Sequence, residues 1–284
     1  MTEALKTYQG NCHCGANRFE VQLPDLPPLA VCDCALCAKK GHVWIYDAEG
    51  RLEITRGCTE ETLTTYTSSA GASLQHQFCS TCGTGMFGTH QSGVLAGKEI
   101  ITLDVDGNIQ PYAGKLSFAE SVATSAVTKH EFSGQLPDLT EEQPVLYTGA
   151  CDCGAIQVAV RSKPLSDVEI KEDNCSICIR NGTVGLYPHQ SQVTIAGREN
   201  TRDYAFGRKF NGAPFCQTCG VHCFGNLYGP PKEIVARLPE AKQEFVRKQL
   251  EVQPLNVRVM DNVDWAEMDI KWSNEGTEGY QLKD

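Results

Sequence analysis

The sequence lacks the features that mark several common classes of protein. No apolar run is long enough to span a membrane, and the segment from Met1 to Gly10 has no apolar core of a signal peptide. No long run of Lys or Arg occurs, and the net charge of −10 disfavours a surface that binds the phosphates of a nucleic acid. We therefore expect a cytosolic or nuclear chain and take the cytoplasm as its location, with neither a membrane nor a nucleic acid as partner.

Common catalytic motifs are also missing. There is no nucleophile elbow, no P-loop and no H-E-x-x-H segment. Residues 83–88 spell G-x-G-x-x-G, but a dinucleotide site needs a strand before this motif and a helix after it. Here the motif begins inside a C-x-x-C-G segment, so we do not interpret it as a nucleotide site.

Cysteine, by contrast, is abundant, with 15 residues among 284. The apolar content of 41% and the charged content of 21% are typical of a globular protein. A cytosolic compartment keeps thiols reduced, so C-x-C and C-x-x-C spacings favour metal thiolates over the disulfides of a secreted scaffold. The clustered cysteines are Cys12, Cys14, Cys32, Cys34, Cys37, Cys79 and Cys82 in the first half, and Cys151, Cys153, Cys175, Cys178, Cys216 and Cys219 in the second.

The second set of cysteines repeats the first. Residues 8–16 align with residues 147–155, and residues 77–83 align with residues 214–220. Between the copies, residues 134–144 are rich in proline and acidic residues and have no periodicity, which is typical of a linker. The sequence therefore predicts two tandem zinc modules, residues 1–135 and 145–284, with a boundary near residue 140.

The remaining pattern favours a mainly β fold. Apolar residues alternate with period two in both copies, as expected for half-buried strands; they are Phe19, Val21 and Leu23, then Ile156, Val158 and Val160. One segment, Pro239 to Val252, has apolar residues at helical spacing and predicts a short helix used for packing. The alternating Leu255, Val257 and Val259 predict a closing strand.

In each copy, the C-x-C turn and the C-x-x-C-G turn are predicted to bind one metal ion together. A closed site with four thiolates leaves no open position, so its role is structural. The sites are Cys12, Cys14, Cys79 and Cys82 in the first copy, and Cys151, Cys153, Cys216 and Cys219 in the second.

The middle cluster of the first copy has only three cysteines, Cys32, Cys34 and Cys37. Three protein ligands and one open position form the pattern of a catalytic zinc, where a thiol or water could bind. The alternative is a further structural site, completed by Cys58 or a histidine.

In the second copy, Asp173 stands where the first copy has Cys32, and Cys175 and Cys178 follow it. A carboxylate can bind zinc, so these three residues predict either a mixed metal site or the loss of the metal. Cys223 is either a spare ligand or a small buried side chain.

Three motifs occur in order: C-x-C-G-A, then C-x-C-x-x-C, then F-C-x-x-C-G. Together they resemble the glutathione-dependent formaldehyde-activating enzyme family, which includes centromere protein V, over residues 8–130 and 147–284. The resemblance implies a β-tent fold, a structural zinc at each four-cysteine site and a catalytic zinc on Cys32, Cys34 and Cys37. It also implies a carbon–sulfur lyase similar to S-(hydroxymethyl)glutathione synthase, which acts on a glutathione adduct of a carbonyl compound.

These expectations define an active first copy and a degenerate second copy. We expect at least three zinc ions, glutathione as co-substrate, and a small-molecule thiol adduct as partner; the oligomeric state is not assigned. Lys39 and Lys40 are candidates for binding glutathione carboxylates, and His13 and His42 are candidate proton carriers. The alternative function is a zinc-stabilised β-tent module that binds a partner without catalysis.

Overall fold

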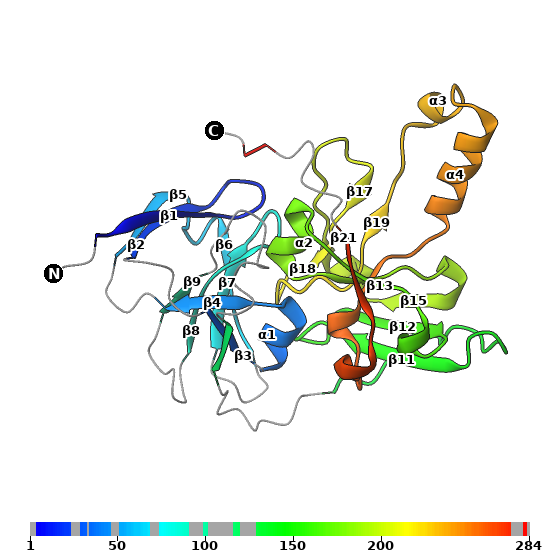
Figure 1. Cartoon of the computed structure of the whole chain (residues 1–284), viewed down its shortest axis with the longest axis horizontal. Coiled ribbons are helices and arrows are strands. Elements are labelled where there is room, and N and C mark those ends of the chain that lie inside the picture. Colours follow the sequence, from blue (N-terminus) through cyan, green and yellow to red (C-terminus); the bar gives the residue numbers. More distant parts are fainter. Residues whose placement is uncertain are drawn as a thin grey trace.

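The computed structural model describes residues 4–23, 29–32, 34–46, 51–68, 74–90, 99–101, 116–119, 129–273 and 281–282. The protein is mainly β, with several small sheets and few helices, as the sequence predicted. Figure 1 shows the strands of the two halves as two neighbouring groups, with helix α1 on the side of the first group that faces the second.

The described residues of the first half form two sheets and one α-helix. A three-stranded antiparallel sheet has the order β1-β2-β5, and a seven-stranded sheet has the order β10-β3-β4-β9-β8-β7-β6. The strands are β1 (Lys6–Asn11), β2 (Arg18–Leu23), β3 (Leu29–Cys32), β4 (Val43–Tyr46), β5 (Leu52–Arg56), β6 (Leu63–Thr67), β7 (Leu74–Cys79), β8 (Gly85–His90), β9 (Glu99–Ile101) and β10 (Leu116–Ala119), and the helix is α1 (Ala35–Lys40).

The second half forms a three-stranded sheet β11-β12-β15, a four-stranded sheet β20-β14-β13-β21 and two strand pairs, β16-β18 and β17-β19. Its strands are β11 (Val145–Ala150), β12 (Gln157–Ser162), β13 (Ile170–Asp173), β14 (Val184–Leu186), β15 (Val193–Ala196), β16 (Thr201–Arg202), β17 (Asn211–Gly212), β18 (Phe215–Cys216), β19 (Asn226–Leu227), β20 (Leu255–Asn256) and β21 (Ile270–Ser273). Its α-helices are α2 (Ser176–Asn181), α3 (Lys232–Val235) and α4 (Glu240–Leu250), and short 3₁₀ helices cover 165–167, 190–192, 198–200, 257–259 and 265–267.

One plan of strand pairing occurs twice. Strand β2 pairs with β1 and β5 as β12 pairs with β11 and β15. Strand β3 has an antiparallel neighbour, β4, and a parallel neighbour, β10, as β13 has β14 and β21. Because these pairings connect equivalent segments, the repeat in the sequence is also a repeat in the fold.

The predicted strands lie where the apolar alternation placed them. Phe19, Val21 and Leu23 are the inward-facing residues of β2, and polar residues alternate with them. In β12, both Val158 and Ala159 are buried, so this strand is covered on both faces. The segment 134–144 contains no strand or helix, and its one pairing is a bridge from Thr140 to Gln143.

Two predictions at the C-terminal end need correction. The closing strand is only two residues long, because the chain turns into a 3₁₀ helix at Val257. The side-chain oxygen of Asn256 caps this helix by accepting the backbone N–H of Arg258 at 3.2 Å, and it also accepts that of Val184 in β14 at 3.2 Å. The apolar residues of the predicted strand are nevertheless all buried.

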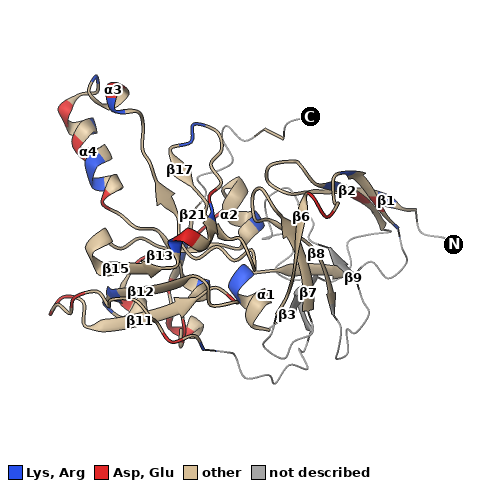
Figure 2. Ribbon diagram, turned by 180° about the vertical axis from the view of Figure 1, so that it is seen from behind, with Lys and Arg blue, Asp and Glu red and all other residues tan. Residues whose placement is uncertain are grey.

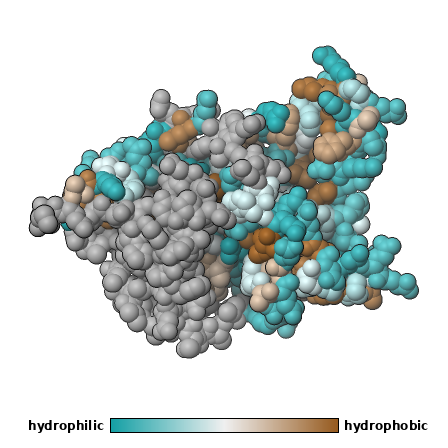
Figure 3. All heavy atoms as spheres, in the orientation of Figure 1, coloured by the Kyte–Doolittle hydropathy of each residue, from teal (hydrophilic) through white to brown (hydrophobic). Residues whose placement is uncertain are grey.

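Helix α4 forms where it was predicted, but it does not pack into the core. It extends from the second group of strands together with α3, as Figures 1 and 3 show, and Phe245 is 63% exposed. Charged residues of both signs cover α4 (Figure 2), and Glu244 pairs with Arg247 at 2.6 Å. In the described part of the chain, no helix is long and apolar enough to cross a membrane.

The hydrophobic core joins the two halves. One buried cluster contains residues of the second half together with Cys34, Leu36, Cys37, Trp44 and Leu74 of the first. A second cluster lies around Phe19, Val21 and the four-cysteine segment of the first half. The middle cysteines of the first copy are therefore packed against the second copy.

Candidate metal centres

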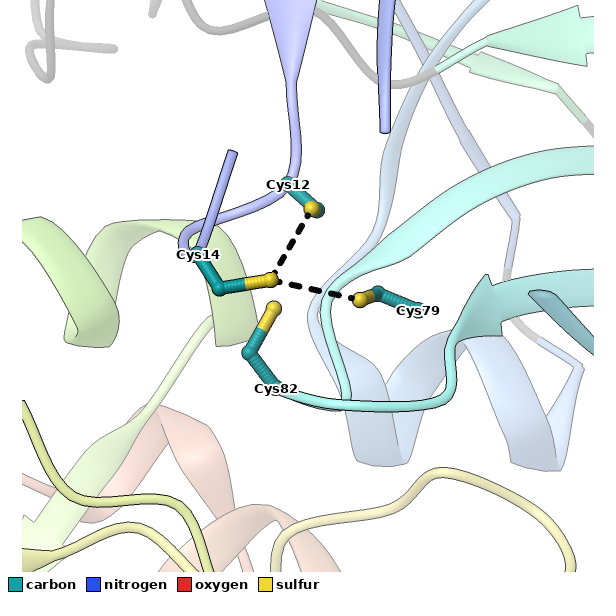
Figure 4. A group of neighbouring side chains, drawn as sticks. All are labelled: Cys12, Cys14, Cys79 and Cys82. Atoms are coloured by element: carbon teal, nitrogen blue, oxygen red, sulfur yellow. Dashed lines mark hydrogen bonds between the residues drawn. The ribbon is translucent and has the colours of Figure 1, made fainter. Parts of the chain in front are cut away.

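Four cysteines of the first copy converge on one point, as Figure 4 shows. Cys12 and Cys14 lie in the turn that follows β1, Cys79 ends β7, and Cys82 lies in the turn before β8. The Sγ atom of Cys14 lies 3.5 Å from that of Cys12 and 3.6 Å from that of Cys79, and all four sulfurs lie within 4.8 Å of one another. Two thiolates on one tetrahedral zinc, each about 2.3 Å from the ion, lie about 3.7 Å apart, so this group fits zinc.

The second copy repeats this group. The Sγ atom of Cys153 lies 3.5 Å from that of Cys151 and 3.5 Å from that of Cys216, and Cys219 completes the group within the same 4.8 Å limit. The two groups also have the same order of burial, with only the second cysteine partly exposed. Cys223 is a buried hydrogen-bond neighbour of Cys151, but it is not one of the four converging residues.

Local backbone geometry explains the glycine after each C-x-x-C. Gly83 has φ 73° and Gly220 has φ 70°, a left-handed conformation that favours glycine. In this conformation, the N–H of Gly83 donates to the carbonyl of Cys79 at 2.9 Å, and that of Gly220 donates to Cys216 at 2.8 Å. These turns place both cysteines of a pair on the same side.

The thiols are too crowded to ionise together without a cation. The hydrogen bond to Cys12 is the main cause that raises the pKa of both Cys14 and Cys79, and burial raises both further. The pKa of Cys153 is raised in the same way by its contact with Cys151. A bound divalent cation stabilises thiolates directly, so the chemistry of both donor sets fits zinc.

The middle cluster of the first copy lies at the turn from β3 to α1. Cys32 ends β3, and its side chain lies outside the described residues, so the three-cysteine zinc site stays a prediction. Cys34 is the N-cap residue of α1, and Cys37 lies one turn later. Their side chains are only 5% and 1% exposed, and the indole N–H of Trp44 donates to Cys37 Sγ at 3.2 Å.

Cys58 does not extend the middle cluster. Its backbone has φ 58°, and its N–H donates to Asn17 Oδ1 at 2.7 Å. It packs on the core cluster that contains Cys12, whereas Cys34 and Cys37 belong to the other cluster. Burial, followed by the charge of Cys12, raises the pKa of Cys58 to about 11. Among the described residues, Cys58 does not converge with Cys34 and Cys37, so the structure gives no support to the alternative in which Cys58 completes the middle site.

The structure brings together the three equivalent residues of the second copy. Asp173 ends β13, Cys175 is the N-cap residue of α2, and Cys178 lies one turn later, with their ligand atoms within 4.8 Å of one another. The Sγ atoms of Cys175 and Cys178 are 2.6 Å apart, which is closer than in either four-cysteine group. Metal binding by these residues stays a prediction.

Lys39 and Lys40 are not solvated, contrary to the usual behaviour of lysines. Both are buried, and the ammonium of Lys40 donates to the carbonyl oxygens of Gly83 at 3.2 Å and Gly220 at 2.5 Å. Burial lowers the pKa of Lys40 to about 8, and nearby thiolates, first that of Cys219, oppose this shift. Lys40 thus connects the C-x-x-C-G turns of the two copies, and contact of Lys39 or Lys40 with a glutathione carboxylate stays a prediction.

Reciprocal hydrogen bonds connect the two C-x-C turns to the opposite copies. His13, between Cys12 and Cys14, bonds through Nδ1 to the hydroxyl of Tyr204 and through Nε2 to that of Ser176, both at 2.9 Å. Asp152, between Cys151 and Cys153, accepts hydrogen bonds from the hydroxyls of Tyr66 and Ser68, both at 2.8 Å. Since Tyr66 and Tyr204 are equivalent positions of the repeat, each copy contacts the other's C-x-C turn through the same tyrosine.

The environments of the histidines limit their possible roles. Burial, followed by the charge of Arg180, lowers the pKa of His13 to about 4, so its imidazole is neutral near pH 7. His42 is buried, with its ring centroid 4.5 Å from that of Trp44, the residue that donates to Cys37.

The sequence did not single out Trp44, Tyr66 or Asp152, although the alignment of Tyr66 with Tyr204 was a signal for paired roles.

Known proteins provide two comparisons. A crystal structure of a Rhodobacter sphaeroides protein, 23% identical, matches 44% of this chain and 99% of its own chain, with a TM-score of 0.33. A sequence model of the family described as "Glutathione-dependent formaldehyde-activating enzyme" matches residues 7–116 and 146–251. These two ranges include more than half of the chain and all thirteen clustered cysteines. The chain therefore belongs to the glutathione-dependent formaldehyde-activating enzyme family, in two tandem copies.

Proposed function

We propose that the first copy is a zinc-dependent carbon–sulfur lyase that acts on a glutathione adduct of a carbonyl compound in the cytoplasm. The observation that carries the proposal is the turn from β3 to α1. It holds the complete C-x-C-x-x-C motif within the matched part of the first copy. The domain division at residues 1–135 and 145–284 is part of the same proposal.

Cys32, Cys34 and Cys37 would hold the zinc ion of this site. Such an ion supplies a Lewis acid and lowers the pKa of a bound thiol. The surroundings of Cys37 suit a charged sulfur, because the N–H of Trp44 donates to it at 3.2 Å and stabilises negative charge there. Trp44 is fully buried, so its ring also keeps water from this side of the sulfur.

The reaction needs one bond change and one proton transfer. In the synthetic direction, the sulfur of glutathione bonds to the carbonyl carbon, and the proton of the thiol ends on the carbonyl oxygen. In the lyase direction, the carbon–sulfur bond breaks and the hydroxyl proton returns to the departing sulfur. His42 lies close to Trp44 in the sequence and packs on the ring of Trp44. This contact supports a role of His42 as the proton carrier.

A non-catalytic binding module is the second candidate. The near-complete burial of Cys34 and Cys37 favours it, because a small substrate must reach the sulfur or the metal beside it. In that case the middle cluster would be a third structural centre, and its loss would destabilise the fold as much as the loss of a four-cysteine site.

The test combines a metal count with activity. We predict about three zinc ions per purified chain, one for each four-cysteine group and one for the middle cluster. We also predict that the protein accelerates the exchange of formaldehyde and glutathione with their adduct. NMR spectroscopy measures the exchange rate with and without the protein. Cys34→Ser should abolish this acceleration while the melting temperature stays within a few degrees. A melting temperature lowered as far as by Cys79→Ser, or no acceleration by the zinc-loaded wild type, would favour the binding module.

A further inference from the structure

The cluster of Cys175 and Cys178 differs from the four-cysteine groups in one measurable way. Its sulfurs are 2.6 Å apart, whereas neighbouring sulfurs in the four-cysteine groups are 3.5 to 3.6 Å apart. Two thiolates on one zinc lie about 3.7 Å apart, so the sulfur spacing of the wider groups matches that of zinc ligands, whereas this pair is about 1 Å closer. The two thiols are instead close enough to react with each other.

The third position of the cluster also departs from a metal site. Asp173 replaces the cysteine of the first copy, which leaves only two sulfurs. The Oδ1 atom of Asp173 accepts the backbone N–H of Cys175 at 3.0 Å and so fixes the turn before α2. This hydrogen bond gives the carboxylate a structural role that needs no ion.

Exposure separates this pair from its counterpart in the first copy. Cys175 and Cys178 are both partly exposed, whereas Cys34 and Cys37 are almost completely buried. The pair of the second copy is therefore the more accessible of the two.

We propose that Cys175 and Cys178 are a dithiol–disulfide couple that reacts with low-molecular-weight disulfides of the glutathione type. The site lies in the second copy and does not depend on the lyase activity proposed for the first. It assigns a chemical role to the copy that lacks the three-cysteine motif.

The chemistry is a thiol–disulfide exchange in two steps. The thiolate of Cys175, stabilised by the backbone N–H of Cys178 at 3.4 Å, attacks one sulfur of the small disulfide and releases one thiolate. The thiolate of Cys178 then attacks the mixed disulfide at Cys175 Sγ and releases the second. In total, the two cysteines lose two protons and two electrons, and the small disulfide gains them as two thiols.

The test uses the full chain, loaded with zinc and treated with oxidised glutathione. Released glutathione is measured, and remaining thiols are alkylated for peptide mapping by mass spectrometry. The wild type should release two equivalents of glutathione and form one disulfide, between Cys175 and Cys178, without losing zinc. Cys178→Ser should stop at one equivalent with glutathione attached to Cys175, and Cys175→Ser should release none.

Cys58→Ser provides the matched control, because Cys58 is also a partly exposed thiol outside the four-cysteine groups. It should release the same two equivalents as the wild type. The proposal is overturned if the wild type forms no disulfide at this pair, or if oxidation spreads equally over the other cysteines. It is also overturned if the wild type holds one more zinc ion than the Cys175→Ser/Cys178→Ser double variant. Peptide mapping and zinc counting on the wild type decide the outcome even if a variant folds poorly.

Discussion

The two copies repeat the residues that form their cysteine-rich turns, but they repeat only some of the residues through which they contact each other. Sulfur spacing, burial order and the glycine turns agree between the two four-cysteine groups. At the contact between copies, His13 stands opposite to Asp152 in the alignment, and Lys40 stands opposite to Asn181. A second lysine at the position of Asn181 would place two buried ammonium groups near one another, at a large electrostatic cost. The difference shows that a tandem chain can use complementary residues where an identical pair of copies could not.

The largest expected effect is the loss of a four-cysteine centre, and it should be equal in the two copies. Cys79→Ser and Cys216→Ser each remove one ligand of a closed zinc site and should each cost several kcal/mol of folding free energy. Thermal unfolding with zinc counting measures both, and Cys58→Ser, which removes no ligand, serves as the control. A large loss in one copy with little change in the other would show that the two centres are not equivalent.

The next effect concerns the buried cation. Lys40→Met leaves the carbonyl oxygens of Gly83 and Gly220 without this donor, at a cost of about 2–4 kcal/mol. Asn181→Ala changes the equivalent residue, whose buried Oδ1 has no hydrogen-bond partner among the described residues, and should cost less than about 1 kcal/mol. Denaturant unfolding compares the two variants. Equal losses would mean that Lys40 does not connect the copies as its contacts indicate.

Acid should weaken the contact between the copies. Burial, then the charge of Lys40, lowers the pKa of His222 to about 3 and that of His76 well below its usual range. The unfolded chain takes up these protons near pH 6.5 and the folded chain does not, so the free energy of unfolding falls as the pH drops from 7 to 5. The loss at pH 5 is about 2 kcal/mol for His222, and His76 adds a loss of the same sign.

Unfolding curves at several pH values, with zinc content followed in parallel, measure this loss. His222→Gln should make the decline between pH 7 and pH 5 shallower at unchanged zinc content. A decline as steep as that of the wild type would exclude His222 as a cause.

The smallest effect separates the two tyrosines. The hydroxyl of Tyr66 donates to a carboxylate, whereas that of Tyr204 bonds to a neutral imidazole. Hydrogen bonds to charged groups are the stronger, so Tyr66→Phe should cost about 1.5–3 kcal/mol and Tyr204→Phe about 1 kcal/mol. Chemical denaturation resolves this difference, and a larger loss in Tyr204→Phe would reverse the ranking of the two contacts.

The sequence predicted those features that depend on local spacing. A C-x-C or C-x-x-C turn determines where two sulfurs lie, so both four-cysteine groups followed from the cysteines alone. Apolar alternation likewise located β2, because each inward residue is set by the pleat of its own strand. The helix at α4 followed from its spacing and from Pro239 before it.

Features that depend on the meeting of two surfaces were not predictable in this way. The burial of Lys39 and Lys40 and the link from His13 to Tyr204 both depend on how the two copies pack. Spacing within one copy contains no information about that packing. The role of Asp173 was also left open, since a carboxylate can either bind a metal or cap a turn, and only its position relative to Cys175 N–H favours the second.

The central claim is that the first copy carries out the reaction and the second does not. Cys37→Ser and Cys178→Ser change equivalent residues of the two copies. Turnover of the glutathione–formaldehyde adduct by these two variants tests the claim most directly. It is measured at matched zinc content of the four-cysteine sites. We predict that Cys37→Ser lowers turnover at least about 100-fold, because even the loss of a residue that only supports a metal ligand can cost about 100-fold. Cys178→Ser should keep most of the activity. Loss of turnover in Cys178→Ser with activity retained in Cys37→Ser would contradict the account.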